Sequence, residues 1–312
     1  MRTKDRFHEI DSALKDLQES IARLQGVDTT ELARKVSEFR EEIYAGISRW
    51  GSIELARHPE RPVLDDYLSA IFQDFTELHG DRLSEDDPAI RGGLAFLDGT
   101  PVVVIGHRKH SRGQKDHARY HYGMASPSGH HKAIRLMELA GRFNRPLITF
   151  VDTPGAYPVP ETEYRGQAFS IARCISTLTT LPVPVIVCII GEAGSGGALA
   201  LGFGDRIIML ENAFYSAISP EAFSSILYGD ASNKELAADA LKGSGRDLAA
   251  EGIVDYLIKE PTGGAQNDPA AVVEETGKVI RRCVEELLNV DRQELVRLRA
   301  AAIERLVPSK AP

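Results

Sequence analysis

One stretch constrains the fold more than any other: an apolar run, a glycine-dense turn and a set of helix formers in direct succession. The stretch is Val183–Gly204, VPVIVCIIGEAGSGGALALGFG. Val185–Ile190 is typical of a short strand buried on both faces. Gly191–Gly197 contains four glycines, and Ala198–Leu201 resumes with good helix formers. This order predicts one strand–turn–helix unit of an α/β fold.

The glycine turn has two interpretations at this point. Backbone N–H groups at the start of a helix converge on an anion or a developing oxyanion, and glycine lets the ligand approach the backbone closely. A tightly packed junction between strand and helix would also require glycines. The turn by itself names no ligand.

A second unit of the same kind precedes the first. Leu147–Val151 is another buried strand, Asp152–Pro158 is a polar turn, and a helix follows Arg165-Gly166-Gln167. Successive units predict parallel strands with right-handed crossovers, so both turns belong at the carboxyl edge of one sheet. Gly155 and Ala156 are then expected to offer N–H groups to the same point as Gly196 and Gly197.

The remaining elements are predicted from spacing and turn signals. Asp98-Gly99 predicts a hairpin between Gly93–Leu97 and Val102–His107. Asp65 or Asp66 begins a predicted helix that runs to Leu78, and His131–Phe143 is another. Two N-terminal helices, one over residues 7–24 that includes Ile10 and one from Asp28 to Trp50, are expected to form an antiparallel hairpin that serves in packing or in subunit contact. The predicted organisation is a helical hairpin at 1–52, a main domain at 53–290, and a C-terminal helix and tail at 291–312.

Composition excludes several classes of protein. The net charge of −8 argues against nucleic acid as a partner. No apolar run is long enough to span a membrane, and the N-terminus does not resemble a signal peptide. The three cysteines are far apart in the sequence, which predicts a reduced, cytoplasmic protein without a cysteine-ligated zinc.

Known catalytic motifs fit the glycine turn poorly. Gly197 stands where a phosphate loop needs lysine, and Leu199 stands where the dinucleotide fingerprint needs its third glycine. The sequence around Ser195 differs at one position from the G-x-S-x-G motif of a nucleophile elbow, but no histidine follows His131 to act as its base. What remains is a turn rich in N–H donors. Such a turn suits the stabilisation of an enolate or a similar oxyanion, in a reaction whose general base comes from the substrate, a cofactor or a partner chain.

The most unusual segment is His107–Lys132, which holds six of the nine histidines. His117 and His121 have the spacing of two zinc ligands, but Ala118 replaces the glutamate of the H-E-x-x-H motif, so no metal is predicted. A basic patch that contacts phosphates or a carboxylate competes with a solvated surface loop. The candidate contacts are Arg108, Lys109, Arg112, Lys115 and Lys132.

Seven ordered runs carry a resemblance to a known family. The chain resembles the alpha subunits of bacterial acetyl-CoA carboxylase carboxyltransferase, over nearly its whole length. The matching runs are Leu55–Pro62, Gly80–Arg82, Ile105–His107, Asp152–Pro158, Arg165–Gln167, Gly194–Ala200 and Ile218–Glu221.

The resemblance implies a crotonase-like α/β fold and an enzyme of two alpha and two beta chains. That enzyme moves a carboxyl group from carboxybiotin, held on a separate biotin carboxyl carrier protein, to acetyl-CoA, which gives malonyl-CoA for fatty acid synthesis. Biotin carboxylase is the component that uses ATP, and zinc is expected in the beta chain.

The resemblance also assigns roles within this chain. The amides of Gly196 and Gly197 form an oxyanion hole for biotin, and Gly155 and Ala156 belong to the same site. The remaining residues on the carboxybiotin side are Gly194, Ser195 and Tyr157. The acyl-CoA substrate makes the basic residues of the histidine-rich segment candidate contacts for the phosphates of coenzyme A.

Several positions depart from the family pattern near this site. Ala193 replaces a usual glycine, and Val159 follows Tyr157-Pro158 where glycine is usual. His130-His131 occupies a usual Tyr-Arg, and a stretch that is usually rich in Lys and Arg here carries His117, Tyr120, His121 and Tyr122. These departures leave two alternatives open: a carboxyltransferase subunit for another acyl-CoA, and a stand-alone crotonase-type enzyme acting on acyl-CoA.

Overall fold

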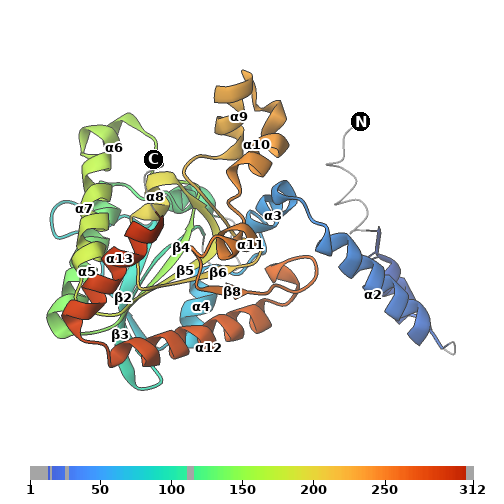
Figure 1. Ribbon diagram of the computed structural model, residues 1–312, viewed down its shortest axis with the longest axis horizontal. Coiled ribbons are helices and arrows are strands. Elements are labelled where there is room, and N and C mark those ends of the chain that lie inside the picture. The colour runs from blue at the N-terminus through green and yellow to red at the C-terminus, as the bar shows by residue number, and fades with distance from the viewer. Residues whose placement is uncertain (1–12, 15, 25–27, 111–115, 307–312) are drawn as a thin grey trace.

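The computed structural model describes residues 13–14, 16–24, 28–110 and 116–306, and an eight-stranded, mostly parallel sheet lies at its centre (Figure 1). The path through the sheet is β1-β2-β3-β4-β5-β6-β8, with β7 paired to β5. The strands are β1 (Gln73–Glu77), β2 (Ile90–Leu97), β3 (Thr100–His107), β4 (Leu147–Thr153), β5 (Val185–Gly194), β6 (Arg206–Leu210), β7 (Phe214–Ser216) and β8 (Tyr256–Ile258).

Helices cover this sheet and extend beyond it. Those near the N-terminus are α2 (Thr30–Ala45), α3 (Arg49–Ala56) and α4 (Leu64–Ile71), and the middle of the chain contributes η1 (His117–Gly123), α5 (Pro127–Phe143), α6 (Pro160–Tyr164), α7 (Gln167–Thr180) and α8 (Ser195–Leu199). The later ones are α9 (Pro220–Tyr228), η2 (Ala231–Asn233), α10 (Lys234–Leu241), α11 (Gly245–Ala250), η3 (Ala265–Asn267), α12 (Pro269–Leu288) and α13 (Arg292–Leu306). The α5 helix packs on β2 and β3, whereas α12 packs on β5, β6 and β8.

The parallel core confirms the two successive strand–turn–helix units. β3, β4, β5, β6 and β8 pair in parallel, and every residue of β4 is buried. The hairpin is confirmed as well, because β2 and β3 are antiparallel with Leu97 opposite Thr100 across Asp98-Gly99. Burial on both faces explains why these strands are continuous apolar runs rather than alternating ones.

The predicted helix from Asp65 to Leu78 is wrong in its second half. The α4 helix ends at Ile71, and β1 follows as an antiparallel neighbour of β2. The pairing register shifts between Gln73 and Thr76, around Asp74 with its φ of 52°. Such a bulge breaks the two-residue alternation of a strand, which gave the apolar residues a helix-like spacing.

The N-terminal region differs from the predicted hairpin in its second helix. The predicted second helix is interrupted between α2 and α3. The Ser48 side chain accepts a hydrogen bond from the Gly51 N–H there and so caps the start of a new helix. The α2 helix projects away from the sheet (Figure 1), and Leu32 and Phe39 on its apolar face are about half exposed. The first predicted helix includes Ile10, which lies outside the described residues, so the antiparallel pairing stays a prediction.

The α13 helix is anchored to the main sheet by one arginine. Arg299 is 1% exposed, pairs with Asp205, and donates to the carbonyl groups of Leu181 and Val183 just before β5. Where the domain boundaries lie stays a prediction. Among the described helices, none combines the length and apolar character that crossing a membrane requires.

Candidate functional site

The carboxyl ends of β4 and β5 lie together, as predicted. Thr153 at the end of β4 is opposite Ala193 near the end of β5. The segment after β4 therefore meets the start of α8 at one edge of the sheet, which is where open α/β folds bind ligands.

The turn itself is shorter than predicted. Gly191–Gly194 continues β5, because Glu192 pairs with Phe214 and Gly194 pairs with Ser216 of β7. The chain turns only at Ser195, a non-glycine residue with a φ of 52°. Glycine is disfavoured inside strands, which is why the sequence pattern placed the turn too early.

Two glycines let the segments after β4 and β5 interlock. A Cβ added to Gly197 would lie 2.6 Å from the Ala156 amide nitrogen and still closer to the Gly155 carbonyl group. A Cβ at Gly194 would overlap the Pro154 carbonyl group. The packing interpretation of the glycines is therefore correct for these two positions, and the packing also determines where the neighbouring amides point.

The candidate donors differ in availability. Gly196 and Gly197 belong to the first turn of α8, where a helix leaves its N–H groups without intrahelical acceptors. Gly155 is different, since its N–H donates to Thr153 Oγ1 at 3.2 Å. The expectation that Gly155 contributes a donor is therefore wrong, whereas its backbone still supports Gly197. Ala156 and Gly196 are partly exposed, and Ser195 is exposed.

Aromatic rings link the histidine-rich segment to the turn after β4. His121 stacks on Tyr157 with ring centroids 4.1 Å apart, and His117 stacks on Tyr122 at 5.6 Å. His121 and Tyr122 both have positive φ, at 48° and 57°. Stacking of this kind offsets part of the cost of two successive left-handed residues. The segment described here is therefore built against the site rather than a solvated loop.

The predicted basic contacts are already paired where the structure describes them. Arg108 pairs with Asp65 at 3.1 Å and lies over the Tyr120 ring, while Lys109 pairs with Asp152 at 3.1 Å. Both are partly buried. Arg112 and Lys115 lie outside the described residues.

The prediction that Lys132 contacts a ligand is wrong. Its side chain is 2% exposed, and its ammonium group donates to the carbonyl groups of Asp87 and Ile90 and pairs with Asp86. With three internal partners and no access to solvent, Lys132 holds the loop before β2 on α5. It is not a contact for coenzyme A.

A pair of arginines that no sequence motif predicted lies behind the glycine turn. Arg57 bridges Glu192 of β5 and Glu221 of α9 at 2.6 and 2.7 Å. Arg61 donates to the Ile190 carbonyl group at 2.7 Å and pairs with the buried Glu260. Both arginines lie in the Leu55–Pro62 run, where buried cations could not be told from surface ones.

These contacts lower the pKa of two carboxyl groups, those of Glu221 and Glu260. Burial by itself would raise the pKa of Glu221, but hydrogen bonds from Arg57 outweigh it and hold that pKa below its usual range. At Glu260, burial again favours the neutral form, and the charge of Arg61 with its hydrogen bonds reverses the effect. Both carboxylates are therefore charged and fixed at neutral pH.

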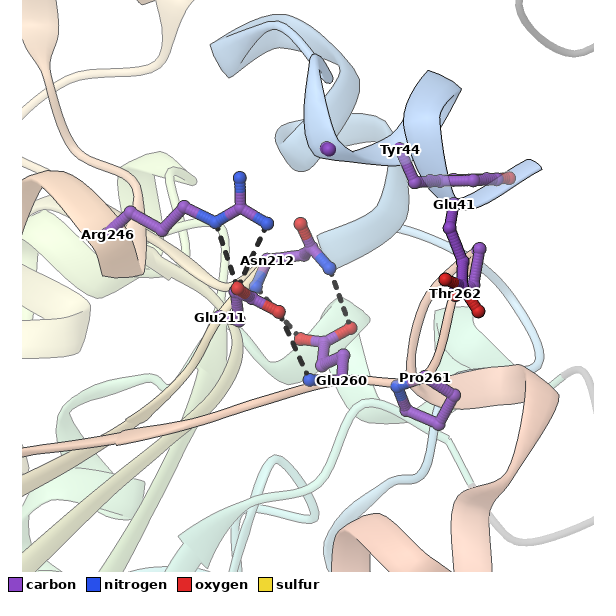
Figure 2. Close-up of a pocket in the computed structure, with 10 residues that line it drawn as sticks. Glu41, Tyr44, Glu211, Asn212, Arg246, Glu260, Pro261 and Thr262 are labelled. Carbon is purple, nitrogen blue, oxygen red and sulfur yellow. Dashed lines mark hydrogen bonds and ion pairs between the residues drawn. The ribbon is translucent and has the colours of Figure 1, made fainter. Parts of the chain in front are cut away.

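A cavity of about 180 Å³ opens beside Glu260, between α2 and the loop after β8 (Figure 2). The close-up shows that internal donors already engage its carboxylates: Arg246 pairs with Glu211, and Asn212 donates to Glu260. The Glu211 and Glu260 carboxylates of the cavity wall are thus already paired within the protein. Within the described part of the chain, no group of three or more His, Cys, Asp or Glu side chains is arranged to hold a metal ion.

Comparison with known proteins identifies the family. A sequence profile described as acetyl co-enzyme A carboxylase carboxyltransferase-like matches residues 3–306. The alpha subunit of acetyl-coenzyme A carboxylase carboxyl transferase from Geobacter metallireducens is 48% identical over 269 residues, which cover 86% of this chain and 84% of the relative. The corresponding subunit from Thermus thermophilus is 44% identical over 296 residues, 94% of each chain. The chain belongs to the carboxyltransferase alpha-subunit family.

Solved structures agree with the fold of this family. Transcarboxylase 12S with methylmalonyl-coenzyme A bound has a TM-score of 0.56 at 18% identity, over 72% of this chain and 44% of the other. A Pseudomonas malonate decarboxylase hetero-tetramer in complex with coenzyme A has a TM-score of 0.57 at 18% identity, over 70% and 90%. The predicted crotonase-like α/β fold is confirmed.

Membership in the carboxyltransferase alpha-subunit family makes the correction at Lys132 testable. Lys132→Met is expected to lower the free energy of unfolding by about 2 kcal/mol, because it leaves a carboxylate and two carbonyl groups without their cation. The KM for acyl-CoA should not change. Urea denaturation and steady-state kinetics of the assembled enzyme measure the two quantities.

Lys278→Met is the matched control, since Lys278 pairs with Glu274 on an exposed helix surface and should be silent in both assays. A Lys132→Met protein with normal stability and a raised KM would contradict the structural role.

Proposed function

We propose that this chain is the alpha subunit of an acetyl-CoA carboxyltransferase and transfers a carboxyl group from carboxybiotin to acetyl-CoA, giving malonyl-CoA. One observation carries the proposal: the interlocked segments after β4 and β5, which present the amides of Gly196 and Gly197 beside an exposed Ser195. The family membership supports the reaction class.

The residues present fit the ureido group of biotin. A ureido oxygen is an acceptor, and Gly196 and Gly197 offer donors that the helix does not use. Gly196 is partly exposed, so a ligand can approach it from solvent. Carboxybiotin supplies the activated carboxyl group when it is bound.

The chain's own residues then stabilise charge at one oxygen atom. The Gly196 and Gly197 amides would donate to the ureido oxygen of bound carboxybiotin, and such hydrogen bonds would be strongest when that oxygen carries negative charge. The Gly155–Ala156 backbone keeps Gly197 in place, and the turn formed by Gly194 and Ser195 leads the strand into the helix. Tyr157, backed by the ring of His121, forms the side wall.

No proton acceptor is needed from this chain in such a reaction. Two histidines, His107 and His130, are buried, at 1% and 0% exposed. Burial lowers their pKa to about 4 and about 3, so both are neutral and shielded. The exposed Ser195 therefore has no buried histidine to activate it, which disfavours a serine hydrolase.

The other components of the proposed enzyme lie on other chains. We infer a beta subunit that binds acyl-CoA and carries zinc, an assembly of two alpha and two beta chains, a biotin carboxyl carrier protein, and biotin carboxylase as the ATP-using component, all in the cytoplasm. The malonate decarboxylase relative in fold is itself a hetero-tetramer in complex with coenzyme A.

A subunit that serves another acyl-CoA is the second candidate. The wall next to Tyr157 is built from His121, where the sequence departs from the family pattern, and the stacked rings occupy space beside the site. A changed wall favours a changed acyl group, so both acetyl-CoA and propionyl-CoA belong in the assay.

The test is reconstitution. The chain is co-purified with a beta subunit, and acyl-CoA carboxylation is measured with carboxybiotin on its carrier. Transfer to acetyl-CoA is expected only with both subunits present, and Ser195→Ala should retain most of it. Turnover by the isolated chain would instead favour a stand-alone crotonase-type enzyme, and transfer only to propionyl-CoA would replace acetyl-CoA with the second candidate.

A further inference from the structure

Two histidines inside the protein have no role in the proposed transfer. His107 ends β3, and His130 lies on α5. Both ring nitrogens of His107 and the Nε2 atom of His130 are enclosed and complete no hydrogen bond of good geometry with the described residues. An enclosed, unpaired polar atom costs about 1–3 kcal/mol, so its retention calls for an explanation.

His107 faces the glycine turn. β3 pairs with β4 so that Gly106 is opposite Phe150, which brings the next residue, His107, to the sheet edge where α8 begins. The ring lies against the backbone carbonyl groups of Phe150 and Gly197, which offset part of the loss of solvent. A neutral imidazole there has one N–H to donate.

The Gly197 carbonyl group is open to such a donor. In a regular helix it would accept from Leu201, but the Leu201 N–H donates to Ala198 at 3.2 Å instead. The other side of Gly197 rests on the Gly155–Ala156 backbone. Gly197 is thus enclosed between one backbone segment and one imidazole ring.

Glycine pairs need such a restraint. Gly196 and Gly197 have no side chains that could fix their φ and ψ angles, so the orientation of their amides depends on what contacts their backbone. Donors to a developing oxyanion act only when they are already oriented. A ring held rigidly in the core can provide that orientation without touching the substrate.

We propose that His107 is a positioning residue: its neutral ring holds the Gly197 peptide and thereby orients the amide donors of the glycine turn. The inference rests on the proposed function for its effect on rate, whereas the restraint on the backbone is a property of the chain itself. The test therefore has one readout for each.

The first readout is hydrogen–deuterium exchange of the folded chain. His107→Leu should speed exchange in a peptide covering Gly194–Leu199. His130→Leu is the matched control: His130 is equally buried and hydrogen-bonds Ser170 at 2.8 Å. It should lower stability without changing exchange in that peptide.

The second readout is the kinetics of the assembled enzyme. His107→Leu should lower kcat by about 10- to 100-fold, the range expected when a catalytic group is displaced by up to an ångström, with KM for acyl-CoA unchanged. His107→Asn and His107→Gln place an amide nitrogen near Nδ1 and Nε2, respectively, and one of them should recover most of the rate.

Three results would overturn the inference. One is a folded His107→Leu chain with unchanged exchange at Gly194–Leu199. Another is unchanged kcat while Gly197→Ala is inactive, which leaves the proposed function standing. The third is a rate loss that Leu, Asn and Gln share in proportion to lost stability. Absence of transfer by the unmodified complex would refute the proposed function, and the exchange result would still decide whether His107 restrains the turn.

Discussion

Gly197→Ala is expected to lower the kcat of carboxyl transfer by at least about 100-fold, the usual cost of losing one oxyanion donor. The added Cβ would lie 2.6 Å from the Ala156 amide nitrogen, against backbone that has no side-chain freedom to yield. The two segments must separate, which turns the Gly197 amide away from its acceptor. Rate measurements on the reconstituted enzyme test this result.

Gly141→Ala provides the matched control for the steric change. Gly141 lies on α5, and its added Cβ would meet only the flexible Leu181 side chain, at 3.1 Å. Co-purification with the beta subunit shows whether each variant still assembles. An assembled Gly197→Ala enzyme with wild-type turnover would remove the oxyanion role from this turn.

Arg61→Met is expected to produce the largest loss of stability, about 3–5 kcal/mol, which is typical when one partner of a buried ion pair is removed. The Arg61 and Glu260 side chains are 3% and 0% exposed. The variant leaves a buried carboxylate whose remaining donors are Asn212 and Ala265. Urea denaturation at neutral pH measures the change.

The pH dependence of this loss provides a second check. In the wild type, Glu260 has a lowered pKa, so it contributes stability above the ordinary glutamate pKa and loses that contribution as the pH falls. Without Arg61, burial dominates and the pKa rises, so protonation relieves the buried charge. The deficit of Arg61→Met should therefore shrink between about pH 7 and about pH 5.

Two further variants separate the ion pair from general packing. Arg61→Met combined with Glu260→Gln should recover part of the lost stability, because no charge stays buried. Arg34→Met removes an arginine paired with Glu31 and Glu38 on an exposed helix and should be silent. A full deficit in the double variant, at every pH, would contradict the electrostatic explanation.

Local pattern was a reliable guide to the buried strands. Leu147–Val151 and Val185–Ile190 are continuous apolar runs because the sheet covers both faces of each strand, and their order requires parallel pairing. The meeting of the two turns follows from that topology alone. The elimination of a lysine phosphate loop and of a downstream histidine base also needs only the sequence.

Pattern failed where tertiary pairing decides the local structure. The residues after Phe72 form a bulged edge strand because β2 pairs with them, although their spacing resembles a helix. Gly191–Gly194 is strand because β7 pairs with it. In both places a partner distant in sequence supplies the hydrogen bonds, and intrinsic propensity is too weak to oppose it.

By itself, the sequence determined the α/β class, the parallel units and the edge of the sheet at which the two turns meet, because apolar runs and glycine spacing are local properties. Only the tertiary structure decided what each polar side chain does. It made Lys132 a buried anchor, used the Gly155 amide within its own turn, and placed Arg57, Arg61 and His107 behind the glycines. The physical reason is that a charge or an imidazole takes its role from its burial and partners, and these exist only once the chain has folded.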